Sequence, residues 1–325
     1  MRASVGTFNL NNLFSRWNFR GAIDAIAAGG QDSAVTVSYR FDDPNNLRLR
    51  TFKSRLVQPK DEVDTQRIAA RIVAMDVDVL AVQEVENIGI LRQFNKEHLG
   101  GLYDFQVLIE GNDPRFIDVG LLSKLPIGVV SSYQTAVHPD DPSRPVFGRD
   151  LQEVEIWSSG RTIRLFTLYN NHLKSNFVPF DQDPVAGAAA ANTRRRRQAE
   201  TVARIVEARM RPDSRYIVLG DMNDPPDSPH LAPMTTTPDL GLVDALAAPQ
   251  ETRPSKDEKP GEAPTTAAWT HRFKKSGQPP EHELYDQIWL SPRLAGKQTG
   301  AFIDRRERHG GDGSDHDPAW ITLEL

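Results

Sequence analysis

The sequence contains no cysteine, and this absence excludes disulfide bonds and thiolate metal sites. It is compatible with a reducing cytosol. No apolar run approaches the roughly 18 residues of a membrane-spanning helix. The amino terminus carries one arginine but neither the apolar segment nor the cleavage site of a signal peptide. We therefore expect a cytoplasmic protein without a membrane span, secreted only if an export signal had been removed.

Positive charge is also scarce. The 39 Lys and Arg residues are outnumbered by 44 Asp and Glu residues, and the net charge of -5 creates no global basic field for a polyanion. Bound metal ions can supply the positive charge that a phosphate needs, so this acidity does not exclude a phosphate substrate. A hydrophobic fraction of 38% with 26% charged residues fits a globular chain with a sizeable core.

The chain is organised around residues 216–226. The apolar run from Tyr216 to Leu219 predicts a buried strand, and a Pro-Pro pair stops it after Asp221 and Asn223. Side chains two residues apart on a strand point to the same side. A carboxylate beside an amide suits Mg²⁺ or a phosphate-bound water better than zinc. A loop that uses Asp and Asn as turn formers is the alternative for this segment alone.

Acid, amide and imidazole side chains also follow other predicted strands. Asn9, Glu84 and His172 each come at or just after the end of a strand-like run. Each has a simpler alternative: a turn residue, an acid that starts a helix, or a histidine satisfied at the surface or in the core. Because a sheet-based enzyme collects its site where several strands end on one rim, we expect these side chains to meet.

Two later segments complete this set. Asp286 lies inside the apolar run 284–290, where an acid costs free energy unless it is paired or binds a ligand. Asp315 and His316 lie in a glycine-rich turn and resemble a base beside a metal ligand or a water-orienting acid. Ser314 lacks the elbow motif of a serine hydrolase. The whole set suits metal-assisted attack of water on a phosphate ester.

At these residues the chain resembles the endonuclease/exonuclease/phosphatase superfamily, and most closely its bacterial deoxyribonuclease-like branch. The resemblance covers nearly the whole chain and rests on six segments in the family's order: Thr7-Phe8-Asn9, Leu80 to Glu84, Asn171-His172-Leu173, Gly220-Asp221-Met222-Asn223, Tyr285-Asp286-Gln287-Ile288 and Ser314-Asp315-His316-Asp317-Pro318. It implies an α/β (α+β) fold, a four-layer sandwich of two mixed β-sheets packed face to face with helices outside. It also implies a single catalytic domain over residues 1–325.

The resemblance implies a site for Mg²⁺ or Mn²⁺. Glu84 would be the principal metal ligand, helped by Asn9 and Asp315. Family members use one or two metal ions, and the sequence leaves that number open.

The resemblance also implies catalytic roles. His316 would act as the general base that deprotonates the attacking water, with Asp286 holding it. His172 would donate a hydrogen bond or a proton to the phosphate oxygens. Asp221 and Asn223 would bind a second metal ion or orient the water and the scissile phosphate. A base of near-neutral pKa suits histidine, and an aspartate partner fixes its tautomer.

Substrate-phosphate contacts are expected from residues near these motifs. Arg149 lies in a segment similar to one in which nucleases of the family place a phosphate-contacting arginine, and Lys174 and Asp118 are further candidates. Arg194 to Arg197 could grip a nucleic-acid backbone. Four consecutive residues go around a helix, so at most two of these arginines can face one ligand.

Three segments interrupt the predicted core elements. Residues 15–60 indicate an excursion that contains a β-hairpin. Residues 181–193 are rich in small residues and predict a mobile loop before a helix that runs to Met210. Residues 250–266 are dense in Pro, Lys, Asp and Glu and predict a flexible loop.

The leading hypothesis is a monomeric, divalent-metal-dependent nuclease that cuts phosphodiesters, with DNA as its partner and substrate. The alternative is a phosphatase or phosphodiesterase acting on lipid head groups, inositol phosphates or nucleotides. A binding module without catalysis is a third hypothesis. A basic stripe beside the site would favour the first, and exposed aromatic residues at the rim, with Phe177, Phe180 or Trp17 as candidates, would favour a lipid substrate.

Overall fold

The computed structural model describes residues 1–14, 60–178, 182–253, 264, 266–274, 276–305 and 312–325. Nearly all of the predicted excursion at 15–60 lies outside the described residues. So do Trp17, Phe180 and most of the predicted loop at 250–266.

Two large β-sheets form the centre of the chain, and both mix parallel and antiparallel pairs. The seven-stranded sheet has the order β12-β16-β17-β1-β2-β4-β3, and the six-stranded sheet has the order β11-β15-β10-β9-β8-β5. In the first, β1 runs parallel to β2; in the second, β9 runs parallel to β10. The strands of the first are β1 (Arg2–Leu13), β2 (Val79–Val85), β3 (Phe105–Leu108), β4 (Asp118–Ser123), β12 (Gln250–Arg253), β16 (Gln298–Asp304) and β17 (Ala319–Glu324). Those of the second are β5 (Ile127–Ser132), β8 (Leu151–Trp157), β9 (Arg164–His172), β10 (Tyr216–Asp221), β11 (Val243–Asp244) and β15 (Asp286–Leu290).

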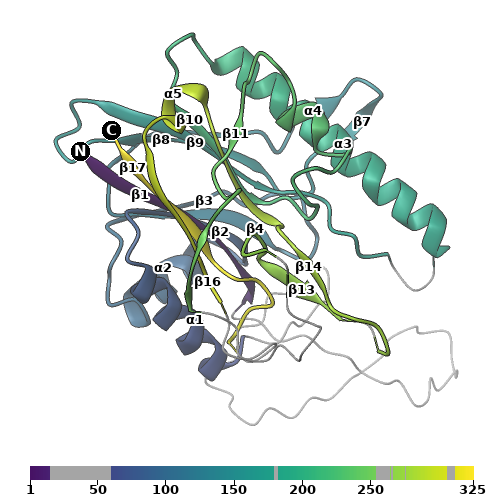
Figure 1. Ribbon diagram of the computed structural model, residues 1–325, viewed down its shortest axis with the longest axis horizontal. Coiled ribbons are helices and arrows are strands. Elements are labelled where there is room, and N and C mark those ends of the chain that lie inside the picture. Colours follow the sequence, from purple (N-terminus) through teal and green to yellow (C-terminus); the bar gives the residue numbers. More distant parts are fainter. Residues whose placement is uncertain (15–59, 179–181, 254–263, 265, 275, 306–311) are drawn as a thin grey trace, which may run out of the picture.

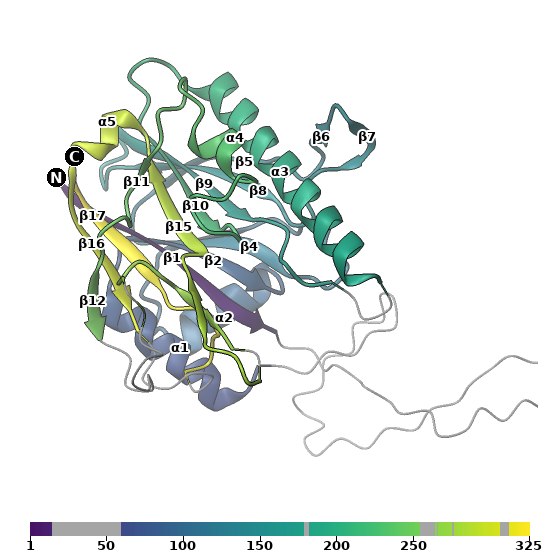
Figure 2. The same ribbon diagram turned by 45° about the vertical axis from the view of Figure 1, so that its right-hand side comes forward.

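The sheets pack face to face, and helices cover their outer faces, which confirms the expected four-layer sandwich (Figures 1 and 2). Helices α1 (Glu62–Met75) and α2 (Ile88–Glu97) cover the first sheet. Helices α3 (Pro184–Arg209) and α4 (Ala232–Thr235) cover the second, and the short α5 (Pro292–Ala295) follows β15. Two small ribbons, β6–β7 (Val137–His138, Asp141–Pro145) and β13–β14 (His271–Phe273, Glu281–Glu283), stand apart from both sheets.

Strand alternation explains why the central strands have continuous apolar sequences. In β10, Ile217 and Leu219 point into the core between the sheets, whereas Tyr216 and Val218 pack under α3. In β2, Val79 and Ala81 enter the core between the sheets, while the alternate residues pack under α1 and α2. A strand that is buried on both faces needs apolar residues at every position.

Helix α1 forms where the sequence predicts it. Asp61 caps its first turn by accepting hydrogen bonds from the backbone amides of Val63 and Asp64. Ile68 and Ile72 are fully buried on its inner face. The helix ends at Asp76, which adopts a left-handed conformation.

Two expectations for loops are wrong. The helix expected from residue 194 begins at Pro184, because Asp183 caps it by accepting from the amide of Ala186 and the alanine-rich residues that follow favour a helix. Gln250–Arg253, expected in a flexible loop, forms β12, which pairs in parallel with β16.

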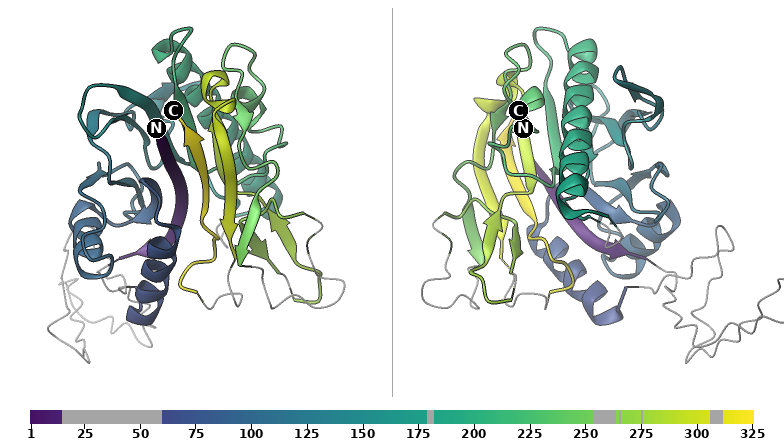
Figure 3. Two further views of the ribbon diagram at one scale, coloured as in Figure 1. Left: turned by 60° about the vertical axis from the view of Figure 1, so that its left-hand side comes forward. Right: turned by 90° about the vertical axis from the view of Figure 1, so that its right-hand side faces the viewer.

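The first and last strands lie side by side, so the chain's two ends meet (Figure 3). The amino group of Met1 donates a hydrogen bond to the carbonyl of Leu325, 3.0 Å away. This pairing brings the turn before β17 next to the far end of β1, and Ser314 donates its hydroxyl hydrogen to the carbonyl of Asn9 at 2.7 Å.

The pairing of β9 with β10 depends on Gly220. Its φ of +126° is a conformation that side chains disfavour, and a Cβ atom there would lie 2.0 Å from the carbonyl oxygen of Asn171. We expect Gly220→Ala to lower the unfolding free energy by about 3 kcal/mol or more. Thermal denaturation measures this loss. Gly160→Ala is the control, because its Cβ would meet nothing closer than 4.0 Å; equal melting temperatures for the two variants would contradict the prediction.

Candidate active site

The ends of two parallel strand pairs meet at one edge of the sandwich. On the first sheet Asn9 pairs with Gln83, one residue before Glu84. On the second, Asp221 pairs with His172 on one side and with Asp286 on the other. Parallel strands end on the same edge of a sheet, so the register gathers the side chains within each sheet, and the packing of the two sheets brings both sets together.

A β-bulge positions Glu84. The register between β2 and β4 shifts so that Gln83 pairs with Val119 and Val85 pairs with Asp118. Glu84 is the extra residue, with a φ of +61° that is unusual outside glycine. Its Oε2 atom accepts a hydrogen bond of 3.1 Å from the amide of Asn12. The bulge therefore takes Glu84 out of the strand pairing, and the hydrogen bond from Asn12 fixes its carboxylate.

Contacts across the two sheets link the expected site residues. Asn9 Nδ2 donates to Asp221 Oδ2 at 2.9 Å. The same oxygen lies 3.4 Å from His172 Nε2 and 3.8 Å from His316 Nε2. His172 Nε2 is in turn 3.9 Å from Glu84 Oε1. The structure thus gathers five of the expected residues into one cluster, in which Glu84 is partly exposed and the other four are buried.

His316 and Asp286 form a close pair. The Nδ1 atom of His316 is 2.6 Å from Asp286 Oδ2, and Asp286 is fully buried. Asp286 is held by its own backbone amide, which donates to Thr270 Oγ1 at 3.0 Å. With Nδ1 facing a carboxylate, Nε2 of His316 is the ring atom available for exchange of a proton.

Asn223 completes the local turn after β10. Its backbone amide donates to Asp221 Oδ1 at 2.9 Å, and its side-chain Nδ2 donates to the carbonyl of Leu173 at 3.2 Å. With a φ of +54°, Asn223 is a further left-handed residue in the site beside Glu84. Strained backbone held by surrounding hydrogen bonds is a feature of functional sites.

The two histidines are driven in opposite directions. Burial lowers the pKa of His316, but the carboxylates of Asp286 and Asp221 outweigh burial and raise it well above the ordinary value. Burial lowers the pKa of His172 well below the ordinary value, and the positive charge of Arg149 adds to this effect. The carboxylates therefore favour the charged imidazolium of His316, whereas burial keeps His172 neutral.

The carboxylates of the cluster resist ionisation. Burial raises the pKa of Asp221 to about 7, and the charge of Asp286 adds to it. Burial also raises the pKa of Glu84, with a contribution from Asp315. In each group, removal from water and a neighbouring negative charge both disfavour the ionised form. A cation placed among them would relieve both effects.

The residues present fit a hard divalent cation. Glu84 and Asp315 lie close enough for one charge to raise the pKa of the other, and the amide of Asn9 adjoins the same cluster. Carboxylate and amide oxygens are the ligands that Mg²⁺ and Mn²⁺ prefer. On this donor chemistry, Glu84, Asn9 and Asp315 are the residues that would hold the ion.

A cation-lined cavity of about 270 Å³ contains two of the three expected phosphate residues. Its lining includes Arg149 and Lys174 together with Arg115 and Arg194. Arg149 is 4% exposed, with Nε 3.3 Å from Asp113 Oδ2 and Nη1 donating to the carbonyl of Leu173. Burial lowers the pKa of Lys174 to about 8, and Arg149 adds to the shift. This cavity is suited to an anion.

Asp118 lies apart from this cavity's lining. It is 2% exposed on β4 and accepts a hydrogen bond of 2.8 Å from the amide of Gly111. Asp118 therefore holds the loop that carries Asp113 and Arg115, and its expected contact with a substrate phosphate stays a prediction.

Three further residues at the site carry no sequence signal. His271 lies in β13 with its ring 5.0 Å from that of His316. Arg115 lines the cation-rich cavity. Lys60 donates to the carbonyl of Asn11 at 2.6 Å; burial lowers its pKa, against the attraction of acids that include Asp315 and Glu84. None belongs to a motif, and each is brought in by pairing or by loop packing.

The fold and the cluster together define a class, hydrolases of phosphate esters. A sequence model of the Endonuclease/Exonuclease/phosphatase family matches residues 6–316, and the chain belongs to this family. Its members act on phosphate esters and typically depend on a divalent metal ion. A comparison with curated protein sequences found no significant match.

Solved structures with the same fold include proteins with different substrates. An endonuclease/exonuclease/phosphatase from Bacteroides vulgatus is 14% identical with a TM-score of 0.60, over 100% of this chain and 99% of that one. A mannosyl-6-phosphatase from Bacteroides thetaiotaomicron is 15% identical with a TM-score of 0.56, over 99% and 100%. TDP2 from D. rerio, complexed with a single-strand DNA product, is 12% identical with a TM-score of 0.54, over 100% and 99%. At these identities the likeness shows the fold alone.

The buried Asp118 predicts a pH effect on stability. Burial raises its pKa from 3.8 to about 7, so the folded chain holds this proton more tightly than the unfolded chain. Its contribution to stability is therefore lost as pH rises from about 4 to about 7. We expect Asp118→Asn, which keeps an acceptor for Gly111, to gain on the order of 2–4 kcal/mol over the wild type across that interval.

Urea denaturation at a series of pH values measures this gain. Asp213→Asn is the control, because the Asp213 side chain is 89% exposed. A constant difference between Asp118→Asn and the wild type at every pH would contradict the assignment.

Proposed function

We propose that this chain is a divalent-metal-dependent phosphodiesterase that cuts nucleic acid, with DNA as its main substrate, by His-assisted attack of water on the phosphate. The observation that carries the proposal is the buried contact of Asp221 with Asn9, His172 and His316, next to a cavity lined by four cationic side chains. The cluster supplies proton transfer, and the cavity supplies a place for a phosphate.

His316 acts as the general base in this mechanism. Asp286 holds Nδ1 of the ring and stabilises the imidazolium that forms on proton transfer. A cation bound among the carboxylates would offset the negative charge that raises the pKa of His316, so that Nε2 could accept the proton of the attacking water. Asp221, 3.8 Å from Nε2, orients that water together with Asn223. The low pKa of His172 keeps its ring neutral, and its Nε2 hydrogen is donated to a phosphate oxygen.

A cation bound by Glu84, Asn9 and Asp315 would supply positive charge to offset the charge that develops on the phosphoryl oxygens. The chain contributes the rest of the electrostatics. Arg149, held by Asp113 and by the carbonyl of Leu173, presents a fixed guanidinium at the cavity wall. Arginine suits this position because its planar fork matches phosphate oxygens.

A second cavity extends the basic surface and favours a polymeric substrate. It has a volume of about 190 Å³ and is lined by Arg144, Arg194 and Arg197, and also by Asp141, which pairs with Arg144 and Arg197. Arg194 also lines the first cavity, so the two adjoin. Helix periodicity permitted two of the four consecutive arginines on one face, and Arg194 and Arg197 are these two. Neighbouring phosphates of one strand would use both cavities.

The other two arginines of the run have structural contacts. Arg195 is fully buried and lies 3.1 Å from Asp224 Oδ2. Arg196 is exposed and pairs with Glu200 on the same helix. The net charge of -5 describes the whole chain, and it is compatible with a basic strip confined to one part of the surface.

An exposed aromatic ring supports a second candidate function. Phe177 is 56% exposed, and its carbonyl accepts a hydrogen bond of 3.1 Å from Lys174 Nζ, which places it at the rim of the cation-lined cavity. It can stack on an unpaired base of a nucleic acid. It can equally enter a lipid surface, so a phosphodiesterase acting on lipid head groups is the second candidate. In the described part of the chain, every helix is too short or too polar to cross a bilayer.

His316→Ala tests the proposed mechanism. We expect it to lower kcat on plasmid DNA by about 10²-fold or more, because removing a general base typically costs that much. Turnover is measured with Mg²⁺ and with Mn²⁺ on plasmid DNA, single-stranded DNA, RNA, bis-p-nitrophenyl phosphate and sphingomyelin vesicles. His98→Ala, at the end of α2, is the control.

Two results would contradict the proposal. Full activity of His316→Ala would remove the base from the mechanism. Turnover of vesicles with none of DNA would transfer the function to the lipid candidate.

Arg194→Ala tests the basic strip. We expect it to weaken DNA binding uniformly across sequences and to reduce the slope of log affinity against log salt by about 0.9, the value for one lost phosphate contact. Binding is measured by fluorescence anisotropy in the His316→Ala background, which prevents cleavage. Arg164→Ala is the matched control, because Arg164 is paired with Glu155 at the opposite end of β9. An unchanged slope for Arg194→Ala would contradict the strip.

A further inference from the structure

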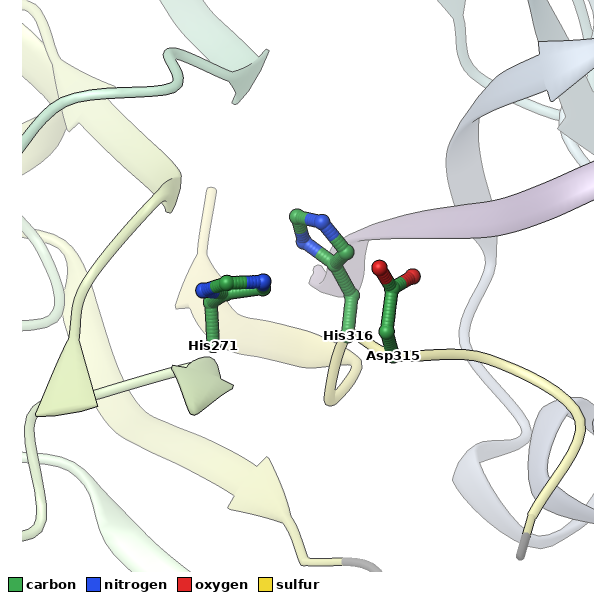
Figure 4. Close-up of side chains that lie close together, drawn as sticks. All are labelled: His271, Asp315 and His316. Atoms are coloured by element: carbon green, nitrogen blue, oxygen red, sulfur yellow. The ribbon is translucent and has the colours of Figure 1, made fainter. Parts of the chain in front are cut away.

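His271 forms a group with Asp315 and His316 that the proposed mechanism does not use. One ligand atom from each of the three side chains lies within 4.8 Å of the other two. Figure 4 shows the His316 side chain between those of His271 and Asp315. The three come from two segments far apart in the sequence, β13 and the turn before β17.

Backbone pairing fixes this juxtaposition. His271 and His316 form an antiparallel bridge, and the amide of Asp317 donates to the carbonyl of Thr270 at 2.8 Å. The His271 ring also stacks on Tyr285, with centroids 5.0 Å apart and planes 17° from parallel. These contacts therefore keep the His271 ring beside His316.

The Asp286 contact prepares His316 for a metal. Histidines that bind metals almost always direct their other ring nitrogen at a carboxylate or a carbonyl. Asp286 Oδ2, 2.6 Å from Nδ1, fills that position and leaves Nε2 as the ring nitrogen that can bind a metal. This arrangement points to a ligand independently of how close the three side chains lie.

The donor set differs in kind from the oxygen site at Glu84. Two imidazoles with one carboxylate suit Zn²⁺ and similar transition metals, whereas Mg²⁺ prefers oxygen ligands and water. Ligands about 2.1 Å from a tetrahedral ion lie about 3.4 Å apart, so the group must contract by roughly 1 Å. Rotation of the partly exposed His271 and of the exposed Asp315 side chains can provide this.

We propose that His271, Asp315 and Nε2 of His316 form a transition-metal site, filled by Zn²⁺, that switches the enzyme off. A metal on Nε2 occupies the lone pair that would accept the proton of water, and it withdraws Asp315 from the oxygen site. The inhibitory effect rests on the proposed function, whereas metal binding does not. Occupation of this site and turnover exclude each other.

Direct binding tests the site without any assay of activity. The full chain, free of Mg²⁺, is titrated with ZnCl₂ against a chromophoric chelator. We expect His271→Phe, which keeps a ring on Tyr285 but loses the ligand, to bind Zn²⁺ at least about tenfold more weakly than the wild type, the usual cost of losing one metal contact. His98→Ala is the control, because His98 lies on α2 outside the group. Equal Zn²⁺ affinity of His271→Phe and the wild type overturns the proposal.

Inhibition tests the consequence. Hydrolysis of bis-p-nitrophenyl phosphate is followed in saturating Mg²⁺ while ZnCl₂ is added, and each variant is compared with its own rate without zinc. We expect the half-inhibitory zinc concentration to rise at least about tenfold in His271→Phe and to stay unchanged in His98→Ala. Equal inhibition of His271→Phe and the wild type, or activation by zinc, overturns the proposal. A wild type inactive with Mg²⁺ on every phosphoester refutes the proposed function instead, and the binding titration alone then decides the site.

Discussion

The buried hydrogen bond from Asn9 Nδ2 to Asp221 Oδ2, 2.9 Å long, joins the two sheets at the edge where the site lies. Asn9 is the last residue of β1 before the register shift in its parallel pairing with β2, and Asp221 is the last residue of β10 that pairs with β9. These pairings carry Glu84 and His172 to the same edge. The site therefore depends on the relative position of the two sheets, which the core between them fixes.

Burial then gives this edge its chemistry. Desolvation raises the pKa of Glu84 and Asp221 and lowers that of His172. The pKa of His316 rises instead, because the carboxylates of Asp286 and Asp221 outweigh desolvation. In a buried site, interactions between charges are stronger than in water, and the charged form of each group is less stable. The left-handed backbone at Glu84 is strained, and the bulge and the surrounding contacts hold it in this conformation.

Two residues outside the six sequence motifs, Arg194 and His271, carry the proposed selectivity and control. Arg194 connects two basic cavities and supports the proposed nucleic-acid substrate. His271 shares His316 with the catalytic cluster, so the proposed inhibitory metal and the proposed substrate would compete for one imidazole. The proposed hydrolysis depends on residues at the strand ends, whereas the proposed substrate preference depends on Arg194 of α3 and the proposed inhibition by a metal depends on His271 of β13.

Local sequence patterns predict the apolar runs of the central strands, the capped helix α1 and the short polar motifs at strand ends, because each depends on residues next to one another in the chain. Asp183 and the alanines after it also predict the early start of α3 by local rules, although small residues can equally indicate a loop. The bulge at Glu84, the pairing of β12 with β16 and the contact of His271 with His316 follow only from the folded chain. Strand register and the contacts between distant segments depend on the packing of the whole chain, and no local pattern specifies them.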